Sequence, residues 1–511
     1  MFSNFAENNE TMSLKSYFIK LYANRVNQYI NIWKKNQLKN QEQIMQSLVQ
    51  KASKTAFGKD HDFLRIKSYE DFKEQIPLRD YEQLSPYINR IINGEKDVLW
   101  PGRPKYFAKT SGTTSGVKYI PITQDSVPNH INTARMALMN YIYLSENSKI
   151  FDGKVIFLSG SPELESIGGI PTGRLSGIVN HEVPPWVKWS QLPSWETNVV
   201  EDWEEKLELI LKETLDKDMR LISGIPPWVQ MYYERLLEKT GKSSVREVFP
   251  NYTLFMYGGV NFEPYRMKLE ELVGGKVDSI ETFPASEGFI AFQDQLDSQE
   301  LLLNTNSDIF FEFVPLHDVG RENPTRVSLK DVELGVDYAL IINNNAGLWG
   351  YEIGDCIRFV SVSPYRLVVT GRVKHFISAF GEHVIGKEVE EAMNRAMAKH
   401  RCSIVEFTVA PQINPSEGTT PYHEWFVEFA SEPQDLVSFA ADLDREMVLQ
   451  NIYYADLIAG KILRPLVLRS MKPNSFREFM KSQGKLGGQN KVPRLSNDRK
   501  IADILSIFIK N

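Results

Sequence analysis

The stretch AKTSGTTSGVKYIPIT, residues 108–123, combines six serine or threonine hydroxyls with two glycines. The backbone N–H groups of a glycine-containing turn, together with nearby hydroxyls, can surround the oxygens of a polyphosphate. Serine, threonine and glycine are also the ordinary residues of solvated loops. The stretch therefore indicates a phosphate-binding hairpin, with an ordinary surface loop as the alternative.

The spacing of this stretch excludes a P-loop, which needs G-x-x-x-x-G-K-[ST] between a strand and a helix. Only three residues separate Gly112 from Gly116, and Lys118 follows two positions after the second glycine. The sequence KYIPIT that comes next is typical of a strand, and helix-like sequence begins only near Ser126. We therefore expect strand, turn and strand.

Three later stretches carry charged residues that a bound nucleotide would need. ETFPASEGFIAFQ sets Glu287 between apolar runs, and a carboxylate there could coordinate Mg²⁺, which prefers oxygen ligands and bound phosphates. GLWGYEIGDCIRFV places Asp355 in strand-like sequence, where an acid can accept hydrogen bonds from two ribose hydroxyls. VTGRVKHFISAFG adds Arg372 and Lys374. Each of these residues alone is also typical of a turn or a solvated charge.

The order of these features, followed by a small C-terminal region, resembles that of the acyl-adenylate-forming enzymes. Within that superfamily the sequence is similar to the Gretchen-Hagen (auxin-responsive) family of acyl acid–amido synthetases, and it looks like a bacterial-type member. The resemblance extends over nearly the whole chain. The stretches that carry it are KTSGTTSGVKYIPIT, MYGGVNFEPYRMKLEELVG, TFPASEG, YEIGDCIRF and GGQNKVPRL.

The resemblance implies that ATP is bound by residues from several stretches. The β- and γ-phosphates would be held by Ser111, Gly112, Thr113, Thr114, Ser115 and Gly116. Lys118 would assist them. Gly258 and Gly259 would line the adenine, and Phe283, beside Thr282, would lie over the purine, because stacking needs only a ring face.

The resemblance also assigns the charged residues. Glu287 would bind a Mg²⁺ ion that bridges the phosphates, and Asp355 would hold the ribose hydroxyls. Arg372 and Lys374 would lie near the nucleotide at a hinge between domains. Lys491, in the glycine-rich loop GKLGGQNKVPRL, would neutralise the charge that grows on the phosphate as a carboxylate attacks it.

The acyl acid itself needs a partner, and the resemblance offers Arg135, in the helix-like stretch INTARMALMNYIYL. A guanidinium can hold a carboxylate with two parallel hydrogen bonds. A surface arginine on a helix is the alternative interpretation.

The implied reaction has two steps. A carboxylate attacks the α-phosphate of ATP, giving an acyl-adenylate and pyrophosphate, and an amine, that of an amino acid, then attacks the mixed anhydride and releases AMP. Two alternatives stay open: an acyl-CoA ligase that uses the same first step, and a non-catalytic module that binds nucleotide and acyl acid.

Alternating strand-like and helix-like segments over residues 153–275 predict an α/β body on a mixed or parallel sheet. From Gly386 the order is helix, two strands, helix, strand and helix, which predicts a smaller α+β domain. We place the boundary near Phe376. The prediction is a nucleotide- and acyl-acid-binding domain over 1–376 with mixed sheets, and a mobile C-terminal domain over 377–511.

Composition narrows the class of protein further. The 511 residues are 24% charged with a net charge of −6, which gives no overall electrostatic case for binding nucleic acid. The sequence contains no apolar run of about 18 residues, so we expect no transmembrane helix. Its first residues, MFSNFAENNE, lack the layout of a secretory signal. With only two cysteines, a reducing cytoplasm is the expected compartment.

The segment LKSYFIKLYANRVNQYINIWKKNQLKN, residues 14–40, is amphipathic at helical spacing and carries six basic residues and no acid. Such a helix could lie on an anionic membrane surface. The interpretation we favour is a helix docked on the body of the protein.

Overall fold

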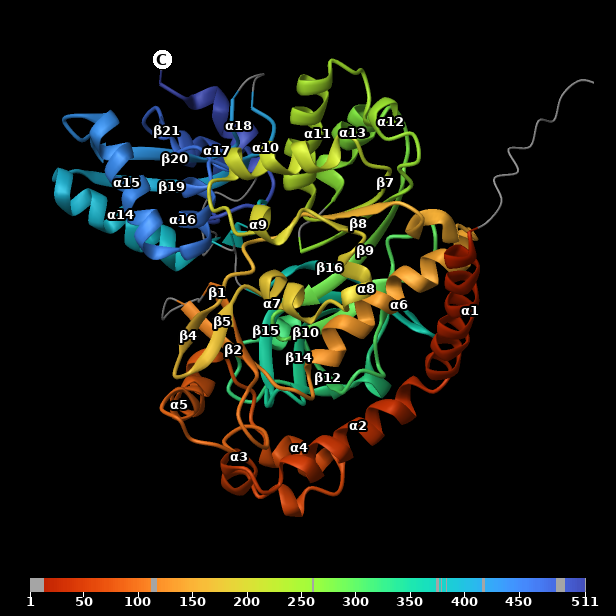
Figure 1. Cartoon of the computed structure of the whole chain (residues 1–511). Coiled ribbons are helices and arrows are strands. Elements are labelled where there is room, and N and C mark those ends of the chain that lie inside the picture. Colours follow the sequence, from red (N-terminus) through yellow and green to blue (C-terminus); the bar gives the residue numbers. More distant parts are fainter. Residues whose placement is uncertain are drawn as a thin grey trace, which may run out of the picture.

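The computed structural model describes residues 13–111, 117–259, 262–373, 376–377, 379–382, 384–415, 419–483 and 492–510. Three main sheets organise this part of the chain (Figure 1). A 12-stranded sheet has the strand order β13-β12-β14-β15-β16-β11-β10-β9-β8-β7-β3-β6, a four-stranded sheet has the order β2-β1-β5-β4, and a three-stranded sheet has the order β19-β20-β21.

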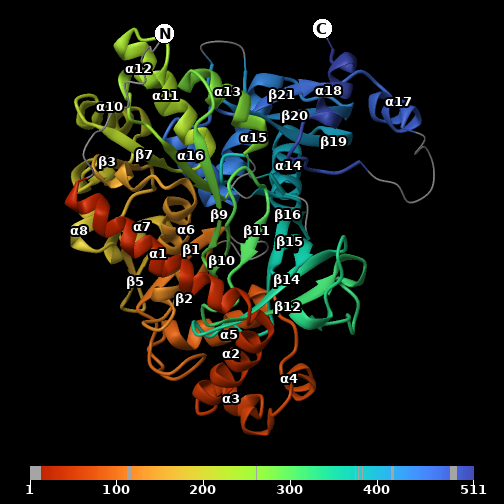
Figure 2. The ribbon, with the colours of Figure 1, turned by 90° about the vertical axis from the view of Figure 1, so that its right-hand side faces the viewer.

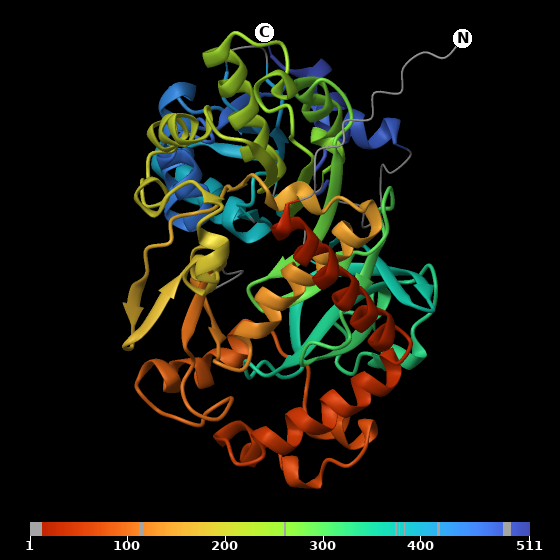
Figure 3. The ribbon, with the colours of Figure 1, turned by 45° about the vertical axis from the view of Figure 1, so that its right-hand side comes forward.

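The first hundred described positions are mainly helical. The helices are α1 (Leu14–Lys34), α2 (Gln37–Ala52), α3 (Ala56–Asp60), α4 (Tyr69–Gln75) and α5 (Tyr81–Ile92). Ser68 begins α4 through a capping box with Asp71, in which each side chain accepts a hydrogen bond from the other residue's backbone N–H. Figure 3 shows these helices wrapping one side and the lower end of the molecule.

The hydroxyl-rich stretch contributes two antiparallel strands, which confirms both predicted strands; the turn between them lies outside the described residues. β1 (Tyr106–Ser111) pairs with β2 (Val117–Ile122), with Thr110 opposite Lys118. β4 (Glu165–Ile167) and β5 (Ile170–Gly173) complete this small sheet, and α6 (Val127–Ser145) follows β2.

The 12-stranded sheet is mixed. Its parallel part consists of β3 (Lys154–Phe157), β6 (Gln191–Leu192), β7 (Met219–Ser223), β8 (Leu254–Gly258) and β9 (Asp278–Ala285). Its antiparallel part consists of β10 (Gly288–Gln293), β11 (Leu301–Leu303), β12 (Ile309–Pro315), β13 (Val327–Ser328), β14 (Asp337–Asn344), β15 (Tyr351–Val362) and β16 (Tyr365–Arg372).

Helices between the parallel strands give the predicted α/β alternation. They are α7 (Leu175–Glu182), α8 (Pro185–Lys188), α9 (Trp195–Asn198), α10 (Trp203–Thr214), α11 (Pro226–Thr240), α12 (Val245–Val248) and α13 (Glu263–Val273). Gly241 ends α11 in the left-handed conformation (φ 64°) that glycine adopts without strain.

The C-terminal part has a small sheet with helices on it, as predicted. Its elements are α14 (Gly386–His400), β19 (Ser403–Gln412), β20 (Tyr422–Ser431), α15 (Leu436–Gln450), α16 (Ile452–Ala459), β21 (Val467–Ser470), α17 (Ser475–Ser482) and α18 (Lys500–Leu505). The predicted order omitted α16 and α18. One buried apolar cluster includes Trp228 of α11 and Trp425 of β20, so the core continues from the large sheet's helices into the small sheet.

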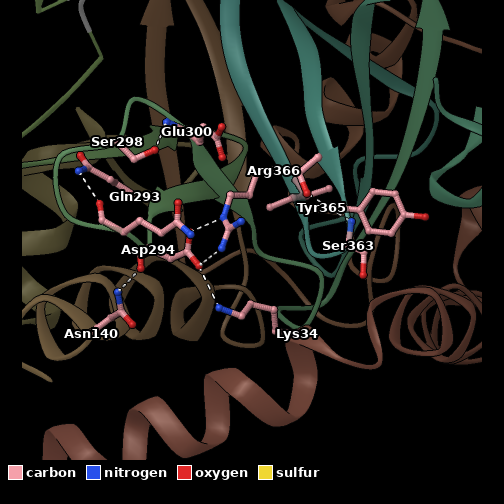
Figure 4. A network of polar contacts seen from close by, with 12 residues as sticks. Lys34, Asn140, Gln293, Asp294, Ser298, Glu300, Ser363, Tyr365 and Arg366 are labelled. Carbon is pink, nitrogen blue, oxygen red and sulfur yellow. Dashed lines mark hydrogen bonds and ion pairs between the residues drawn. The ribbon is translucent and has the colours of Figure 1, made fainter. Parts of the chain in front are cut away.

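The end of α1 is tied to the large sheet through Asp294, which follows β10 and is 4% exposed. Its carboxylate accepts hydrogen bonds from Lys34 Nζ (3.0 Å) and from Arg366 Nε (2.7 Å) of β16 (Figure 4). Its backbone carbonyl accepts one from Asn140 Nδ2 of α6 (3.1 Å). Breaking one partner of such a buried pair leaves a charge uncompensated, so α1 is held firmly on the body.

His130 of α6 provides a pH test of the folded core. Its side chain is buried, and burial lowers its pKa to about 4 from 6.5. Between pH 6.5 and pH 4 only the unfolded chain takes up a proton at this histidine. The free energy of unfolding is therefore unaffected by His130 above pH 6.5 and decreases as the pH falls toward 4. From pH 7.5 to pH 5 we expect this group to remove about 2 kcal/mol of stability. Urea unfolding of wild type and His130→Gln at both pH values measures the difference, and His317→Gln, at an exposed histidine, should keep the wild-type slope.

None of the described helices is long and apolar enough to cross a membrane.

Candidate active site

Parallel pairing of β8 with β9 brings two predicted nucleotide-binding stretches side by side. Gly258 lies opposite Thr282, whose hydroxyl donates to the carbonyl of Tyr257 at 2.8 Å. A Cβ at Gly258 would stand 2.4 Å from the carbonyl oxygen of Thr282, so the strands can approach only with glycine there. Gly259 follows in a left-handed conformation (φ 79°) and turns the chain away from the strand.

Gly258→Ala should therefore lower the free energy of unfolding by roughly 1–3 kcal/mol, because the new methyl group meets fixed backbone. Thermal unfolding monitored by circular dichroism measures the change. Gly386→Ala is the matched control, since nothing lies within 4 Å of the added Cβ there. Equal melting temperatures for Gly258→Ala and wild type would show that the two strands are not this close.

Phe283, which we predicted to lie over the purine, is largely buried in this structure. Its side chain is only 9% exposed and belongs to the main apolar core under the large sheet. The ring therefore supports β9 from the core side and offers little of its face to a purine.

Glu287 lies in the tight turn between β9 and β10, and two asparagines hold that turn. Asn344 Nδ2 donates to the backbone carbonyl of Glu287 at 2.7 Å. Asn129 of α6 accepts from the N–H of Phe289 at 2.7 Å and donates to its carbonyl at 3.3 Å. These bonds fix the backbone at Glu287 and two residues after it, and no motif in the sequence pointed to either asparagine.

Asp355 and Arg372 are brought together by the antiparallel pairing of β15 with β16. They are direct partners in the register, and the N–H of Val373 donates to the carbonyl of Gly354 at 2.9 Å. Asp355 is 8% exposed. The side chain of Arg372 and all of Lys374 lie outside the described residues.

The hairpin that we predicted to bind phosphate is described only at its two strands. Ser111 ends β1 opposite Val117, and residues 112–116 lie outside the described part of the chain, as does the side chain of Ser111. The ammonium of Lys118 lies 5.6 Å from the centre of the Tyr81 ring. The strands thus fix where the turn begins and ends.

The C-terminal part reaches this hairpin through Tyr453 of α16. Its hydroxyl donates to the carbonyl of Lys109 in β1 at 2.6 Å. The pKa of the Tyr453 hydroxyl is raised overall, chiefly because the group is buried, and the Glu287 carboxylate raises it further. A hydrogen bond with Thr110 and the positive charge of Arg174 act in the opposite direction and lower it. One side chain therefore contacts the hairpin strand and lies within electrostatic reach of Glu287.

A cation and a carboxylate complete this junction. The guanidinium of Arg174, just after β5, lies 4.8 Å from the centre of the Tyr453 ring and forms an ion pair with Asp456 of α16. No motif in the sequence pointed to Arg174, Tyr453 or Asp456, because the contact joins residues about 280 positions apart.

Lys491 lies outside the described residues, but the chain just after it is anchored. Val492 is buried, and Thr408 Oγ1 of β19 donates to the carbonyl of Pro493 at 2.7 Å. The N–H of Val409 donates to the carbonyl of Arg494 at 3.0 Å. The chain that follows Lys491 is therefore fixed on β19, at the edge of the small sheet.

Arg135 does not lie with the other predicted residues. Its guanidinium donates to Asn132 at 2.8 Å and lies 5.9 Å from the centre of the Tyr22 ring of α1. The side chain is exposed on the outer side of α6. This position gives no support to a role in holding the acyl acid.

The predicted nucleotide-binding residues therefore belong to the hairpin strands, the β8–β9 pair, the β9–β10 turn and the β15–β16 pair, and α16 contacts the hairpin. Comparison with solved structures shows that the fold is that of acyl-adenylate-forming enzymes. GH3.15 acyl acid amido synthetase superposes with a TM-score of 0.61 at 15% identity, covering 100% of this chain and 98% of that one. A 2-hydroxyisobutyryl-CoA ligase superposes with a TM-score of 0.58 at 14% identity, covering 92% and 91%.

Family models identify the chain more narrowly. The GH3 family N-terminal domain matches residues 28–180 and 172–277, the central domain matches 302–372, and the C-terminal domain matches 387–500. The chain belongs to the GH3 family, which confirms the resemblance to the Gretchen-Hagen enzymes.

Similar curated proteins include two plant enzymes. A jasmonoyl–L-amino acid synthetase of Nicotiana attenuata, JAR4, is 23% identical over 86% of this chain and 88% of its own. The indole-3-acetic acid-amido synthetase GH3.3 of Arabidopsis thaliana is 23% identical over 91% and 90%. The chain is accordingly an enzyme of the acyl acid–amido synthetase type, an adenylate-forming ligase that transfers an acyl group to an amino acid.

Proposed function

We propose that this chain uses ATP and Mg²⁺ to convert an organic carboxylic acid into an acyl-adenylate in the region described above, and then passes the acyl group to an amino acid. The observation that carries the proposal is the position of Tyr453, which joins the hairpin strand, the neighbourhood of Glu287 and the C-terminal part. Acyl transfer through an adenylate needs such a meeting point, because the acid and the phosphates must be held against each other.

In this proposal the turn 112–116, with Ser111 and Lys118, holds the β- and γ-phosphates, and Gly258, Gly259 and Thr282 line the base. Phe283 packs into the apolar core and so supports β9. Asp355 accepts hydrogen bonds from the ribose hydroxyls, and Arg372 and Lys374 contribute positive charge beside it.

The donor set suits Mg²⁺ bound mainly through the substrate. Within the described ranges no three histidine, cysteine, aspartate or glutamate side chains gather as a metal site. Mg²⁺ characteristically takes one or two carboxylates together with phosphate oxygens and waters. Glu287 would supply the carboxylate, and the bound ion would offset the charge on the phosphates.

Lys491 carries the largest catalytic role in the proposal. Its ammonium would approach the α-phosphate and neutralise the charge that develops there during attack by the carboxylate. We place the domain division near Phe376, so that residues 377–511 move relative to residues 1–376 between the two steps. The enzyme would act in the cytoplasm.

Release of pyrophosphate from ATP tests the proposal. The purified chain is incubated with MgATP and a panel of carboxylic acids, and pyrophosphate is measured alone, with amino acids, or with coenzyme A. We expect acid-dependent release and an amide product with an amino acid. A thioester with coenzyme A in place of the amide would favour the acyl-CoA ligase. No release with any acid would favour a non-catalytic binding module.

A further inference from the structure

Helix α1 carries apolar side chains on two opposite faces. The inner face packs on α6 and the large sheet through Ala23, Ile30 and Trp33, all of them buried. This contact confirms the prediction of a docked helix.

The outer face of α1 is exposed although it is equally apolar. Phe18 is 63% exposed and Ile32 is 64% exposed. At 100° per residue the exposed positions 14, 17, 18, 21, 25, 28, 29 and 32 fall on one continuous stripe, with Arg25 and Gln28 as its polar members. We call this surface the outer stripe; its apolar members are Leu14, Tyr17, Phe18, Leu21, Tyr29 and Ile32. A contiguous exposed apolar surface of this kind marks a binding site more often than scattered single residues do.

Trp189 adds an exposed aromatic side chain near the start of α1. It is 80% exposed, and its carbonyl accepts from Lys154 Nζ at 2.6 Å. The next residue, Ser190, accepts from Lys15 Nζ at 3.4 Å, so this segment lies beside the first turn of α1. Figure 2 shows α8, which directly precedes Trp189, close to that end of the helix.

Positive charge accompanies the outer stripe. Three of the six basic residues of this segment are used internally: Lys15 on backbone and Ser190, Lys20 on Glu146 and Lys34 on Asp294. The exposed cations that remain near the helix have no acidic partner among the described residues; they are Arg25, Lys35, Lys39 and Arg135.

Carboxylates near the outer stripe are few. Asp152 accepts hydrogen bonds from Ser13 and Ser16 at the start of the helix. Asp308 lies near Tyr29, where burial and this charge together raise the pKa of the tyrosine hydroxyl. The balance of exposed charge along the helix is therefore positive, on a chain whose net charge is −6.

We propose that the outer stripe of α1, together with the nearby Trp189, docks the enzyme on an anionic lipid bilayer. Leu14, Phe18, Leu21 and Ile32 would enter the boundary between headgroups and acyl chains. Tyrosine and tryptophan are suited to that boundary, since each has an apolar ring with a polar tip. Arg25, Lys35 and Arg135 would contact the phosphates of the headgroups.

Charge favours lipid over a second copy of the chain. Two copies facing each other through α1 would bring the same cations together, and like charges repel. An anionic bilayer meets both the apolar and the basic residues favourably.

The position of α1 fits this role. Figure 1 places it at the edge of the molecule opposite the C-terminal sheet, and Figures 2 and 3 show it on the outside, in front of α6. The ion pair of Lys34 with Asp294 and the packing on α6 fix the helix, so docking needs no unfolding of the body.

Flotation with vesicles tests the proposal on the full-length chain. We expect binding to phosphatidylcholine vesicles that contain phosphatidylglycerol, weaker binding in high salt, and little binding to pure phosphatidylcholine. Arg25→Gln with Lys35→Gln should weaken binding about 25-fold, from about fivefold for each charge near the surface. Phe18→Ser with Leu21→Ser should weaken it by roughly tenfold or more for each side chain.

Matched controls place the same changes elsewhere on exposed positions. Met267→Ser with Val437→Ser removes two exposed apolar side chains, and Lys96→Gln with Lys472→Gln removes two exposed charges. Both controls should bind like wild type. Absence of vesicle binding, equal binding to neutral vesicles, or equal losses in the controls would overturn the proposal. So would a dimer in sedimentation velocity that Phe18→Ser with Leu21→Ser abolishes without any vesicle binding by wild type.

Discussion

Lys491→Ala should lower the rate of acyl-adenylate formation by about 10²–10³-fold, the usual effect of removing a preorganised donor from a developing oxyanion. Binding of ATP should change far less, because in the proposed function the hairpin turn and Mg²⁺ hold the phosphates of the ground state. A single-turnover assay of pyrophosphate release measures the first quantity, and equilibrium binding of ATP measures the second. In the proposal, the ammonium of Lys491 contacts the phosphate only as the carboxylate attacks. Removing this contact should therefore lower the rate of the step and leave ATP binding nearly unchanged.

Lys481→Ala is the matched control for this experiment. Lys481 lies in the last turn of α17 (Ser475–Ser482), a few residues before the same glycine-rich loop, and it is exposed. Its removal should leave both quantities near the wild-type values. Equal losses of binding and rate in Lys491→Ala would mean that this ammonium holds ground-state phosphate instead.

The parts of the fold that local sequence determines were predictable. The capping box at Ser68, the left-handed glycine at Gly241 and the helix over residues 386–400 each depend on neighbours within a few positions. The order of elements in the C-terminal part followed from the same local patterns, apart from α16 and α18.

The strand order of the large sheet was not predictable in this way. β11 pairs with β16, about 65 residues later, and β9 connects the parallel part to the antiparallel part. Such pairings depend on the packing of the whole core, and periodicity within one strand does not specify its neighbour. The same limit applies to the candidate site. The sequence motifs indicated Glu287 and Asp355, but they could not predict the contact of Tyr453 with β1, which joins residues far apart in the chain.

Arg135 shows the same limit on a helix. Its position after the hairpin suggested a place in the acyl-acid site, but the direction in which a helical side chain points depends on how the helix packs. α6 turns its buried face to the large sheet through Met136 and Ala137, and this leaves Arg135 beside Tyr22. In the same way, the period of α1 indicated an amphipathic helix and did not reveal that its exposed face is apolar too.

Glu287→Gln should raise the Mg²⁺ concentration needed for half-maximal pyrophosphate release by about 10- to 100-fold, a range typical of damage to a metal site. The substitution removes the negative charge and leaves the shape of the side chain nearly unchanged. The backbone carbonyl of residue 287 still accepts from Asn344, so the turn keeps its anchor. Initial rates at fixed ATP and increasing MgCl₂ measure the shift, and a partial recovery of rate at high MgCl₂ should accompany it.

A second variant separates the charge of Glu287 from the position of its turn. Asn129→Asp keeps an oxygen that accepts from the N–H of Phe289 but loses the donor to its carbonyl, so it loosens the turn while the Glu287 carboxylate remains. This variant should lower the maximal rate with a smaller change in Mg²⁺ dependence, since the metal's carboxylate is still present. If Glu287→Gln leaves the Mg²⁺ dependence of wild type unchanged, the ion is held elsewhere and Glu287 serves only the structure of the turn.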